Sequence, residues 1–212
     1  MHNPDAVALI TLDVQNDFTL PGAPAEIPGT SQVIPNIVQL IEAFRAAHAP
    51  VIHIVRLYLP DGSNVDLCRR EAVRSGNRMI LPGTDGAELV EALKPSRSIR
   101  LQPDVLLQGK AQRIGDDEVI LYKPRWGAFY GTPLEALLRE RGIDALVFCG
   151  CNFPNCPRAS IYEASERDFQ IAVAADAVSG IYPQGIRELE RIGVTVQETA
   201  EIVSWLTSIP HQ

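Results

Sequence analysis

Short runs of apolar, mainly β-branched residues recur along the chain, and each run is bounded by polar or turn-forming residues. The runs cover residues 7–12, 51–58, 118–122, 145–149, 170–174 and 194–197. Continuous apolar runs of this length are typical of strands that are buried on both faces of a sheet. The pattern therefore predicts six strands in the interior of the protein.

Amphipathic helical patterns lie between most of these strands. A helix that begins near Ser31 has an apolar face formed by Val33, Ile34, Ile37, Val38, Ile41 and Phe44. Another begins at Thr132, which we expect to cap it, with Pro133 in the first turn and Glu135 closing a capping box. Strands that alternate with helices predict a parallel sheet covered on both faces. We therefore expect an α/β fold, a Rossmann-like three-layer sandwich with a six-stranded, mainly parallel sheet flanked by helices.

The segment 61–115 interrupts this alternation. It is polar and broken by glycine and proline, and only residues 84–93 show a short helical pattern. The rest of the chain shows no break in composition, and 212 residues of which 46% are hydrophobic can bury one sizeable core. We expect a single domain over residues 1–212, with a long excursion from the sheet.

Charge and apolar runs limit the partners. The 19 basic residues are scattered, and the formal net charge is −7, so we expect no nucleic-acid partner. The chain starts without a basic and apolar leader, and no apolar run approaches the roughly 18 residues of a membrane helix, so we expect no membrane partner and a cytoplasmic location. In that reducing compartment the four cysteines, Cys68, Cys149, Cys151 and Cys156, are expected to be free thiols.

Candidate chemistry follows from the ends of the predicted strands. Ligands of an open parallel sheet bind beyond the carboxyl ends of its strands. Asp13 follows the first strand, Lys123 follows the third, and the loop after the fourth carries Cys156. Taken singly, each has an ordinary structural explanation, because an Asp can cap a turn, a Lys can be solvated and a Cys can fill a core.

Cys156 has the strongest local case. Pro157 suits the first turn of a helix over residues 157–167, which would place the thiol at a helix N-terminus. The exposed amide groups and the helix dipole at such a position favour the thiolate, so we expect a lowered pKa for Cys156. The same amide groups could hold an oxyanion.

Four sequence motifs together resemble the isochorismatase-like cysteine hydrolases over nearly the whole chain. They are LDVQNDF at 12–18, KPRWGAFYGT at 123–132, GCNFPNC at 150–156 and DAV at 176–178. The resemblance implies a six-stranded parallel sheet in a homo-oligomer, a dimer or tetramer. It also implies a catalytic triad of Asp13, Lys123 and Cys156, and a cis peptide between Cys151 and Asn152.

A mechanism can be written for this triad. Asp13 would act as the base for Cys156, Lys123 would balance the charge, and the thiolate would attack an amide or ureido carbon to form an acyl-enzyme. The backbone N–H groups of Asn152 and Cys156 are the predicted oxyanion hole. Family members that cleave isochorismate do so without a nucleophilic cysteine, so the presence of Cys156 favours C–N bond cleavage.

We expect neither a metal nor another cofactor. Nicotinamidase-like members of the family bind a metal through an Asp and two His after the second strand, whereas this chain has His53 within that strand and no partner histidine. We interpret His53 as a packed strand residue. Cys149, Cys151 and Cys156 resemble half of a zinc site, but no second Cys or His pair has ligand spacing.

The substrate pocket is predicted from residues near the triad, namely Phe18, Trp126, Phe129, Asn152 and Asn155. Trp126 and Phe129 could equally be packing residues. Arg125 and Arg158 could anchor a substrate carboxylate, be solvated or bridge subunits. The predicted function is cysteine-dependent hydrolysis of a small amide or ureido compound. The alternatives are a nicotinamidase-like enzyme, a lactam hydrolase, a non-catalytic small-ligand-binding protein and a thiol redox role, although a phosphate-binding loop and the Cys-x-x-Cys spacing are both missing.

Overall fold

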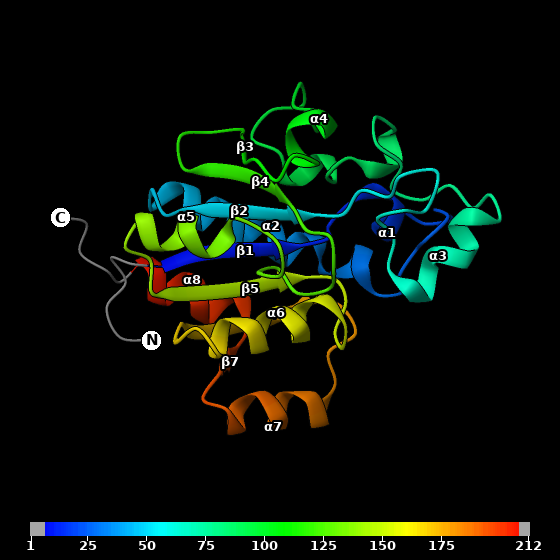
Figure 1. Cartoon of the computed structure of the whole chain (residues 1–212). Helices are drawn as coiled ribbons and strands as arrows, with labels where there is room; N and C mark the ends of the chain where they lie inside the picture. Colours follow the sequence, from blue (N-terminus) through cyan, green and yellow to red (C-terminus); the bar gives the residue numbers. More distant parts are fainter. Residues whose placement is uncertain (1–6, 208–212) are drawn as a thin grey trace.

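A mainly parallel sheet forms the centre of the computed structural model, which describes residues 7–207. Its seven strands have the order β3-β4-β2-β1-β5-β6-β7 (Figure 1). They are β1 (Val7–Leu12), β2 (Val51–Val55), β3 (Gln112–Arg113), β4 (Glu118–Tyr122), β5 (Ala145–Gly150), β6 (Gln170–Val178) and β7 (Thr195–Gln197). All neighbouring strands are parallel except β3, which runs antiparallel to β4. The predicted fold class is confirmed. The predicted count of six strands is corrected to seven. The additional strand is β3, whose two residues are too few to form an apolar pattern in the sequence.

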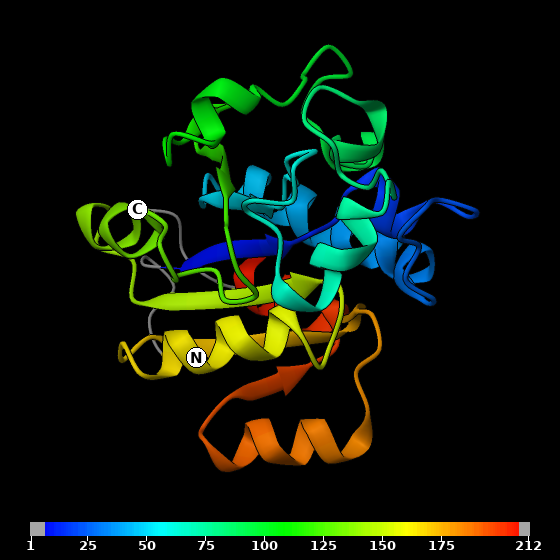
Figure 2. The ribbon, with the colours of Figure 1, turned by 45° about the vertical axis from the view of Figure 1, so that its right-hand side comes forward.

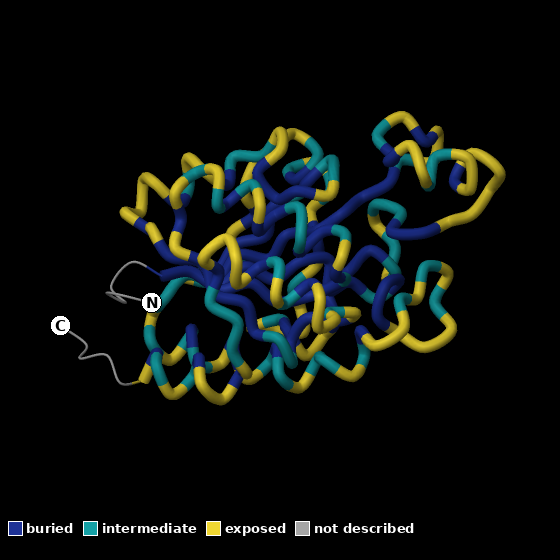
Figure 3. Tube along the Cα trace, turned by 90° about the horizontal axis from the view of Figure 1, so that it is seen from below, coloured by how far each residue is buried: buried dark blue, intermediate teal, exposed yellow. Residues whose placement is uncertain are grey.

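The two faces of the sheet bury different helices. Along β1, Val7 and Leu9 pack in one apolar cluster with α2 (Thr30–Ala46) and α8 (Thr199–Thr207). Ala8, Ile10 and Leu12 pack in another with α5 (Leu134–Glu140), α6 (Cys156–Ser165) and α7 (Pro183–Arg191). Alternate side chains of a strand point to opposite faces, which explains why the central strands are apolar at most positions. Figure 3 shows the buried strands between the partly exposed helices.

Strand order reverses beside β1. The chain builds β2 and β4 on one side of β1 and then returns to its other side with β5. Loops that follow β1 and β5 therefore diverge at the carboxyl end of the sheet, which is where such folds bind ligands. The short helix α1 (Asn16–Thr19) lies at this end (Figure 1).

The excursion between β2 and β4 lies along the β4 edge of the sheet and reaches beyond the carboxyl ends of its strands (Figure 1 and Figure 2). It contains α3 (Leu67–Arg74), the 3-10 turns η2 (Asp85–Ala87) and η3 (Glu91–Leu93), and α4 (Pro103–Leu106). The predicted helix over 84–93 is therefore two separate turns. Helix α3 was missed because Val73 is its only buried residue, and one apolar position makes no periodic pattern.

The start of α5 also differs from the prediction. The helix begins at Leu134, whose backbone N–H donates to Thr132 Oγ1 at 3.3 Å. Glu135 forms an ion pair with Arg167 at 2.9 Å, so it does not close the predicted capping box. No helix within residues 7–207 combines the length and apolar composition that crossing a bilayer requires.

Candidate active site

Three side chains from different strand ends meet at one edge of the sheet. Asp13 directly follows β1, Lys123 directly follows β4, and Cys156 opens α6 after β5. Their exposed fractions are 3%, 0% and 8%, respectively. Asp13 Oδ2 lies 2.8 Å from Lys123 Nζ, and the charges of both groups act on the Cys156 thiol. The structure thus brings together the three residues that were selected from their positions after the predicted strands.

The backbone turns sharply where Asp13 leaves β1. Asp13 has φ +53°, in the left-handed region that Asp tolerates better than most residues. Its N–H still donates to Ile54 O at 2.9 Å. Beside it, β5 ends at Gly150 with φ +115°, where a Cβ atom would lie 2.3 Å from Leu12 O. Only glycine permits this close approach of the two strand ends.

The ammonium group of Lys123 is fully enclosed. The Lys123 backbone N–H donates to Val55 O at 3.0 Å, which extends the pairing of β4 with β2 by one residue. Its Nζ donates to Arg125 O at 3.3 Å and pairs with Asp13. A buried cation needs such partners, so Lys123 and Asp13 depend on each other.

The second carboxylate oxygen of Asp13 is free to act as a base. Asp13 Oδ1 is buried and has no hydrogen-bond partner of ordinary geometry among the described residues. A buried, unpaired carboxylate oxygen is costly, which makes it a strong acceptor for a nearby proton. The nearby proton donor is the Cys156 thiol. The negative charge of Asp13 disfavours a free thiolate at Cys156.

The expected lowering of the Cys156 pKa is wrong, because the pKa is raised. Burial is the largest cause, since a thiolate loses hydration there, and the negative charge of Asp13 adds to it. The positive charges of Lys123 and Arg56 act in the opposite direction. The resting side chain is therefore a neutral thiol, and its activation requires transfer of a proton.

The loop 151–156 presents two amide groups beside the thiol. The peptide between Cys151 and Asn152 is cis, as is the one between Phe153 and Pro154. The backbone N–H groups of Asn152 and Cys156 donate to no backbone carbonyl among the described residues. The first amide groups of a helix lack an intrahelical partner, so the amide of Cys156, at the start of α6, remains available for an oxyanion.

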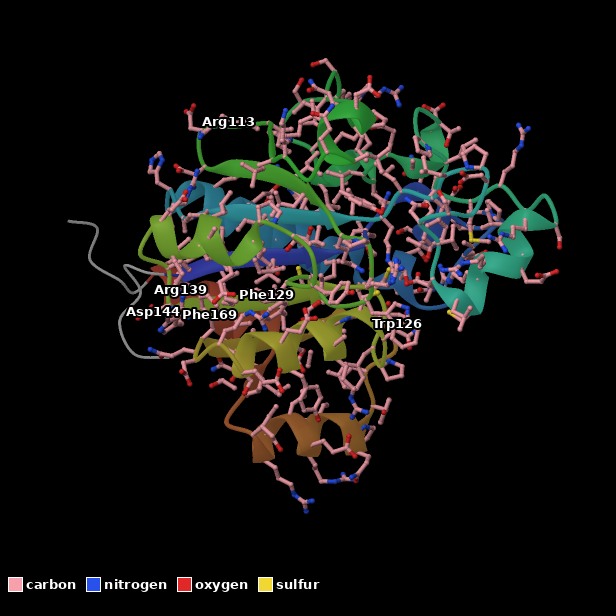
Figure 4. The ribbon with its side chains drawn as sticks, viewed as in Figure 1. Arg113, Trp126, Phe129, Arg139, Asp144 and Phe169 are labelled. Carbon is pink, nitrogen blue, oxygen red and sulfur yellow. The ribbon has the colours of Figure 1, made fainter. Side chains whose placement is uncertain are left out.

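A pocket opens at the thiol. It is lined by Asp13, Phe18, Ile27, Arg56, Tyr58, Cys68, Arg69, Trp126, Cys151, Asn152, Asn155 and Cys156. Four of the five predicted pocket residues therefore line it. Phe129 does not, because it packs in the core against Phe169 with ring centroids 5.7 Å apart (Figure 4). Trp126 is 43% exposed and lies apart from that pair.

Arg56 is a pocket residue that the sequence pattern missed. Its guanidinium lies 2.5 Å from Asp66 Oδ2, which also accepts the hydroxyl of Tyr58 at 2.7 Å. Burial disfavours the charged form of Arg56, but the negative charges around it, that of Asp13 first, outweigh burial and raise its pKa. Burial raises the pKa of Tyr58, because it disfavours the charged form of the phenol. Both side chains are held in one protonation state, so they shape the pocket and its charge.

Residues 7–204 match the isochorismatase domain. The chain belongs to the isochorismatase family. A probable inactive nicotinamidase of Arabidopsis thaliana is 30% identical over 92% of this chain and 94% of its own length. An N-carbamoylsarcosine amidase of Arthrobacter is 28% identical over 96% and 72%, respectively. The crystal structure of an isochorismatase family protein from Desulfovibrio vulgaris is 33% identical, covers 95% and 98%, and has a TM-score of 0.81.

The prediction of an isochorismatase-like cysteine hydrolase is thus confirmed. The predicted class of enzyme, an amidohydrolase, is confirmed at the level of the family, since relatives include an N-carbamoylsarcosine amidase. One relative is named as probably inactive. Family membership alone therefore does not establish catalytic activity. Activity requires that Asp13, Lys123 and Cys156 can together carry out the reaction.

The metal site of some isochorismatase family members does not fit this chain. After β2, Arg56 puts a guanidinium into the pocket wall and pairs with Asp66, so a cationic side chain already neutralises that carboxylate. His53 lies inside the sheet, where its Nδ1 is hydrogen-bonded to Thr11 Oγ1 and its Nε2 to Glu118 Oε1, each at 2.8 Å. Within residues 7–207 no cluster of three His, Cys, Asp or Glu could hold a metal ion.

Helix α6 also holds the loop that follows Lys123. Ser160 Oγ accepts the N–H of Ala128 at 3.0 Å, and a Glu163 carboxylate oxygen accepts the N–H of Phe129 at 2.9 Å. A Cβ atom on Gly127 would lie 2.1 Å from that carboxylate. Hydrogen bonds therefore connect α6, which contains Cys156, to the loop that contains Lys123 and Trp126.

Arg125 and Arg158, the two proposed carboxylate anchors, lie outside the pocket wall. Arg125 donates to Pro124 O and to Asn64 O. Arg158 pairs with Glu188 and lies over the ring of Phe153, 4.9 Å from its centroid. Both guanidinium groups are used within the fold.

Proposed function

We propose that this isochorismatase-family chain hydrolyses a C–N bond in a small amide or ureido compound. In this proposal Cys156 is the nucleophile, Asp13 the general base and Lys123 their electrostatic partner. The observation that carries it is the buried Asp13 carboxylate. One of its oxygens is paired with Lys123, and the other has no partner of ordinary hydrogen-bond geometry within residues 7–207 and lies beside the neutral Cys156 thiol. An N-carbamoylsarcosine amidase among the relatives supports a ureido or amide substrate.

The first half of the reaction forms the acyl-enzyme. Cys156 Sγ attacks the carbonyl carbon while its proton passes to Asp13 Oδ1, so the thiolate need not exist in the resting state. The negative charge that develops on the carbonyl oxygen is stabilised by the backbone N–H groups of Asn152 and Cys156. The C–N bond then breaks, and the nitrogen leaves as ammonia or an amine with the proton from Asp13.

The second half restores the enzyme. Water gives a proton to Asp13 and attacks the thioester or thiocarbamate carbon, after which the C–S bond breaks and the thiol recovers its proton. Lys123, whose Nζ lies 2.8 Å from Asp13 Oδ2, stabilises each state in which Asp13 is charged. The cavity at the thiol measures about 50 Å³, a space suited to a carboxamide or ureido group.

Ammonia release across a panel of small amides and ureas tests the proposal. We expect Cys156→Ala and Asp13→Asn to lower kcat/KM at least about 10³-fold. Cys149→Ala is the matched control, because Cys149 is a buried thiol of β5 outside the pocket wall. If Cys156→Ala still releases ammonia from every compound that the wild type attacks, the nucleophile assignment fails. If the wild type binds panel compounds without turning any over, the non-catalytic binding alternative holds.

Two further expectations belong to the same proposal. The enzyme works in the cytoplasm as a homodimer or homotetramer, with neither a metal nor another cofactor. Light scattering coupled to gel filtration measures the assembly. Activity after exhaustive chelation measures the metal requirement, and we expect it to be unchanged.

A further inference from the structure

Arg69 differs from every other charged residue of the pocket wall. Asp13 is paired with Lys123, and Arg56 is paired with Asp66. The guanidinium of Arg69 has no carboxylate partner and donates no hydrogen bond to a described residue. With the other charges neutralised in pairs and Cys156 held as a neutral thiol, the pocket carries one uncompensated positive charge.

A cation–π contact with Phe18 positions that charge. Arg69 lies in the first turn of α3, and its guanidinium carbon is 5.2 Å from the centroid of the Phe18 ring. Both side chains line the pocket that contains Cys156. An arginine stacked on an aromatic ring keeps the N–H groups at its edge available, and their planar arrangement matches a carboxylate.

Arg56 cannot serve the same purpose. It is 3% exposed, and Asp66 already occupies its guanidinium. Arg69 is partly exposed, so an incoming ligand can reach it without breaking an ion pair.

We propose that Arg69 binds a carboxylate of the substrate, so that the substrate is a small amide or ureido acid whose carboxylate is separate from the scissile C–N bond. This inference rests on the proposed function and names the substrate class of that site. Binding and chemistry then come from different segments, since the excursion supplies the anion-binding group through α3 and the strand ends supply the nucleophile and its base.

Two alkylating reagents that differ only in charge test the inference without knowledge of the substrate. Iodoacetate carries a carboxylate and iodoacetamide does not, and both alkylate Cys156 Sγ with loss of iodide and of the thiol proton. The rate of each reaction at Cys156 is measured by peptide mass spectrometry, which separates Cys156 from the exposed Cys68. The quantity compared between variants is the ratio of the iodoacetate rate to the iodoacetamide rate.

We expect Arg69→Met to lower this ratio about 10-fold, the lower end for a hydrogen bond to a charged group because the site is partly exposed. Arg69→Lys keeps the charge and should retain most of the preference. Arg70→Met is the matched control on the same helix, because the Arg70 guanidinium donates to Val65 O and lies outside the pocket wall, so the ratio should not change.

An unchanged ratio in Arg69→Met would overturn the inference, and so would an equal slowing of both reagents. Either result leaves the proposed function intact if iodoacetamide still labels Cys156. Failure of the proposed function looks different: in the wild type, both reagents would label Cys68 and neither would label Cys156. That result would overturn the inference as well, since it depends on an accessible nucleophile.

Discussion

The ion pair of Lys123 and Asp13 allows a worked prediction for stability. Lys123→Met removes a fully buried ammonium and leaves Asp13 Oδ2 without its partner at 2.8 Å. At that distance, with an effective dielectric constant of about 20, the attraction between the two charges is about 6 kcal/mol. Breaking a buried pair from one side costs about 3–5 kcal/mol, because the remaining charge stays buried. Arg56 still acts on Asp13, so we expect a loss near the lower end.

The double variant separates this effect from lost packing. Asp13→Asn alone removes the carboxylate charge that pairs with the buried ammonium, so it should also destabilise the fold. Asp13→Asn with Lys123→Met leaves no buried charge in the pair. We therefore expect the double variant to lose about 3 kcal/mol less than the sum of the two single losses.

Urea denaturation of the wild type and the three variants at neutral pH measures these free energies of unfolding. A double variant whose loss equals the sum of the single losses to within about 0.5 kcal/mol would refute the coupling. In that case Lys123 and Asp13 would be adjacent without depending on each other, and the account of Lys123 as the partner of the base would lose its physical reason.

Three more predictions follow from the same contacts. Because burial and Asp13 raise the Cys156 pKa, alkylation of Cys156 should keep accelerating with pH beyond the range of a free thiol, and Asp13→Asn should shift that curve to lower pH; equal curves would contradict it. Gly127→Ala should lower activity and cost roughly 2 kcal/mol or more in thermal melts, because its Cβ meets the Glu163 carboxylate; an unchanged melt would refute the close packing of the loop after Lys123 against α6. Burial acts against the charged form of Glu118, but the hydrogen bonds from His53 and Arg45 outweigh it and lower the Glu118 pKa. The ionised Glu118 therefore stabilises the fold above the pKa that Glu118 has in the unfolded chain, and this contribution is lost as the pH falls through the lower pKa of the folded state. Glu118→Gln should therefore make the free energy of unfolding depend less on pH in the acid range.

The strands were predictable because their signal is local. A strand buried on both faces is apolar at most positions, and the run at 118–122 matches β4 from end to end. Asp13 and Lys123 were predictable for the same reason, since they directly follow such runs and parallel strands share one carboxyl edge. Residues in that position are found by counting along the chain.

Arg56 was missed because the end of β2 depends on a side chain far away in sequence. The apolar run continues to residue 58, which placed Arg56 within the predicted strand. In the structure, the ladder ends at Val55, and the side chain of Gln15 takes its place by accepting the N–H of Arg56 and donating to its carbonyl oxygen, each at 2.8 Å. No hydrophobic pattern indicates such a substitution of a side chain for a strand.

Long-range packing decided the remaining differences. Phe129 lies close to Lys123 in sequence, but it packs against Phe169 in the core. Arg69 was missed because α3 is polar on nearly every side. The pKa of Cys156 is raised, whereas the position at a helix start predicted a lowered value. The prediction lacked the burial of the thiol and the nearby Asp13 carboxylate, which depend on the three-dimensional fold.

Intact-mass analysis during turnover of a panel compound that releases ammonia tests the central claim most directly. With the wild type quenched in acid, we expect a mass increase equal to the acyl or carbamoyl part of the substrate, localised to Cys156 by peptide mapping and absent from Cys156→Ala. The Cys149→Ala control should carry the same adduct as the wild type. Ammonia release with the adduct on another residue, or at an undiminished rate from Cys156→Ala, would contradict the account.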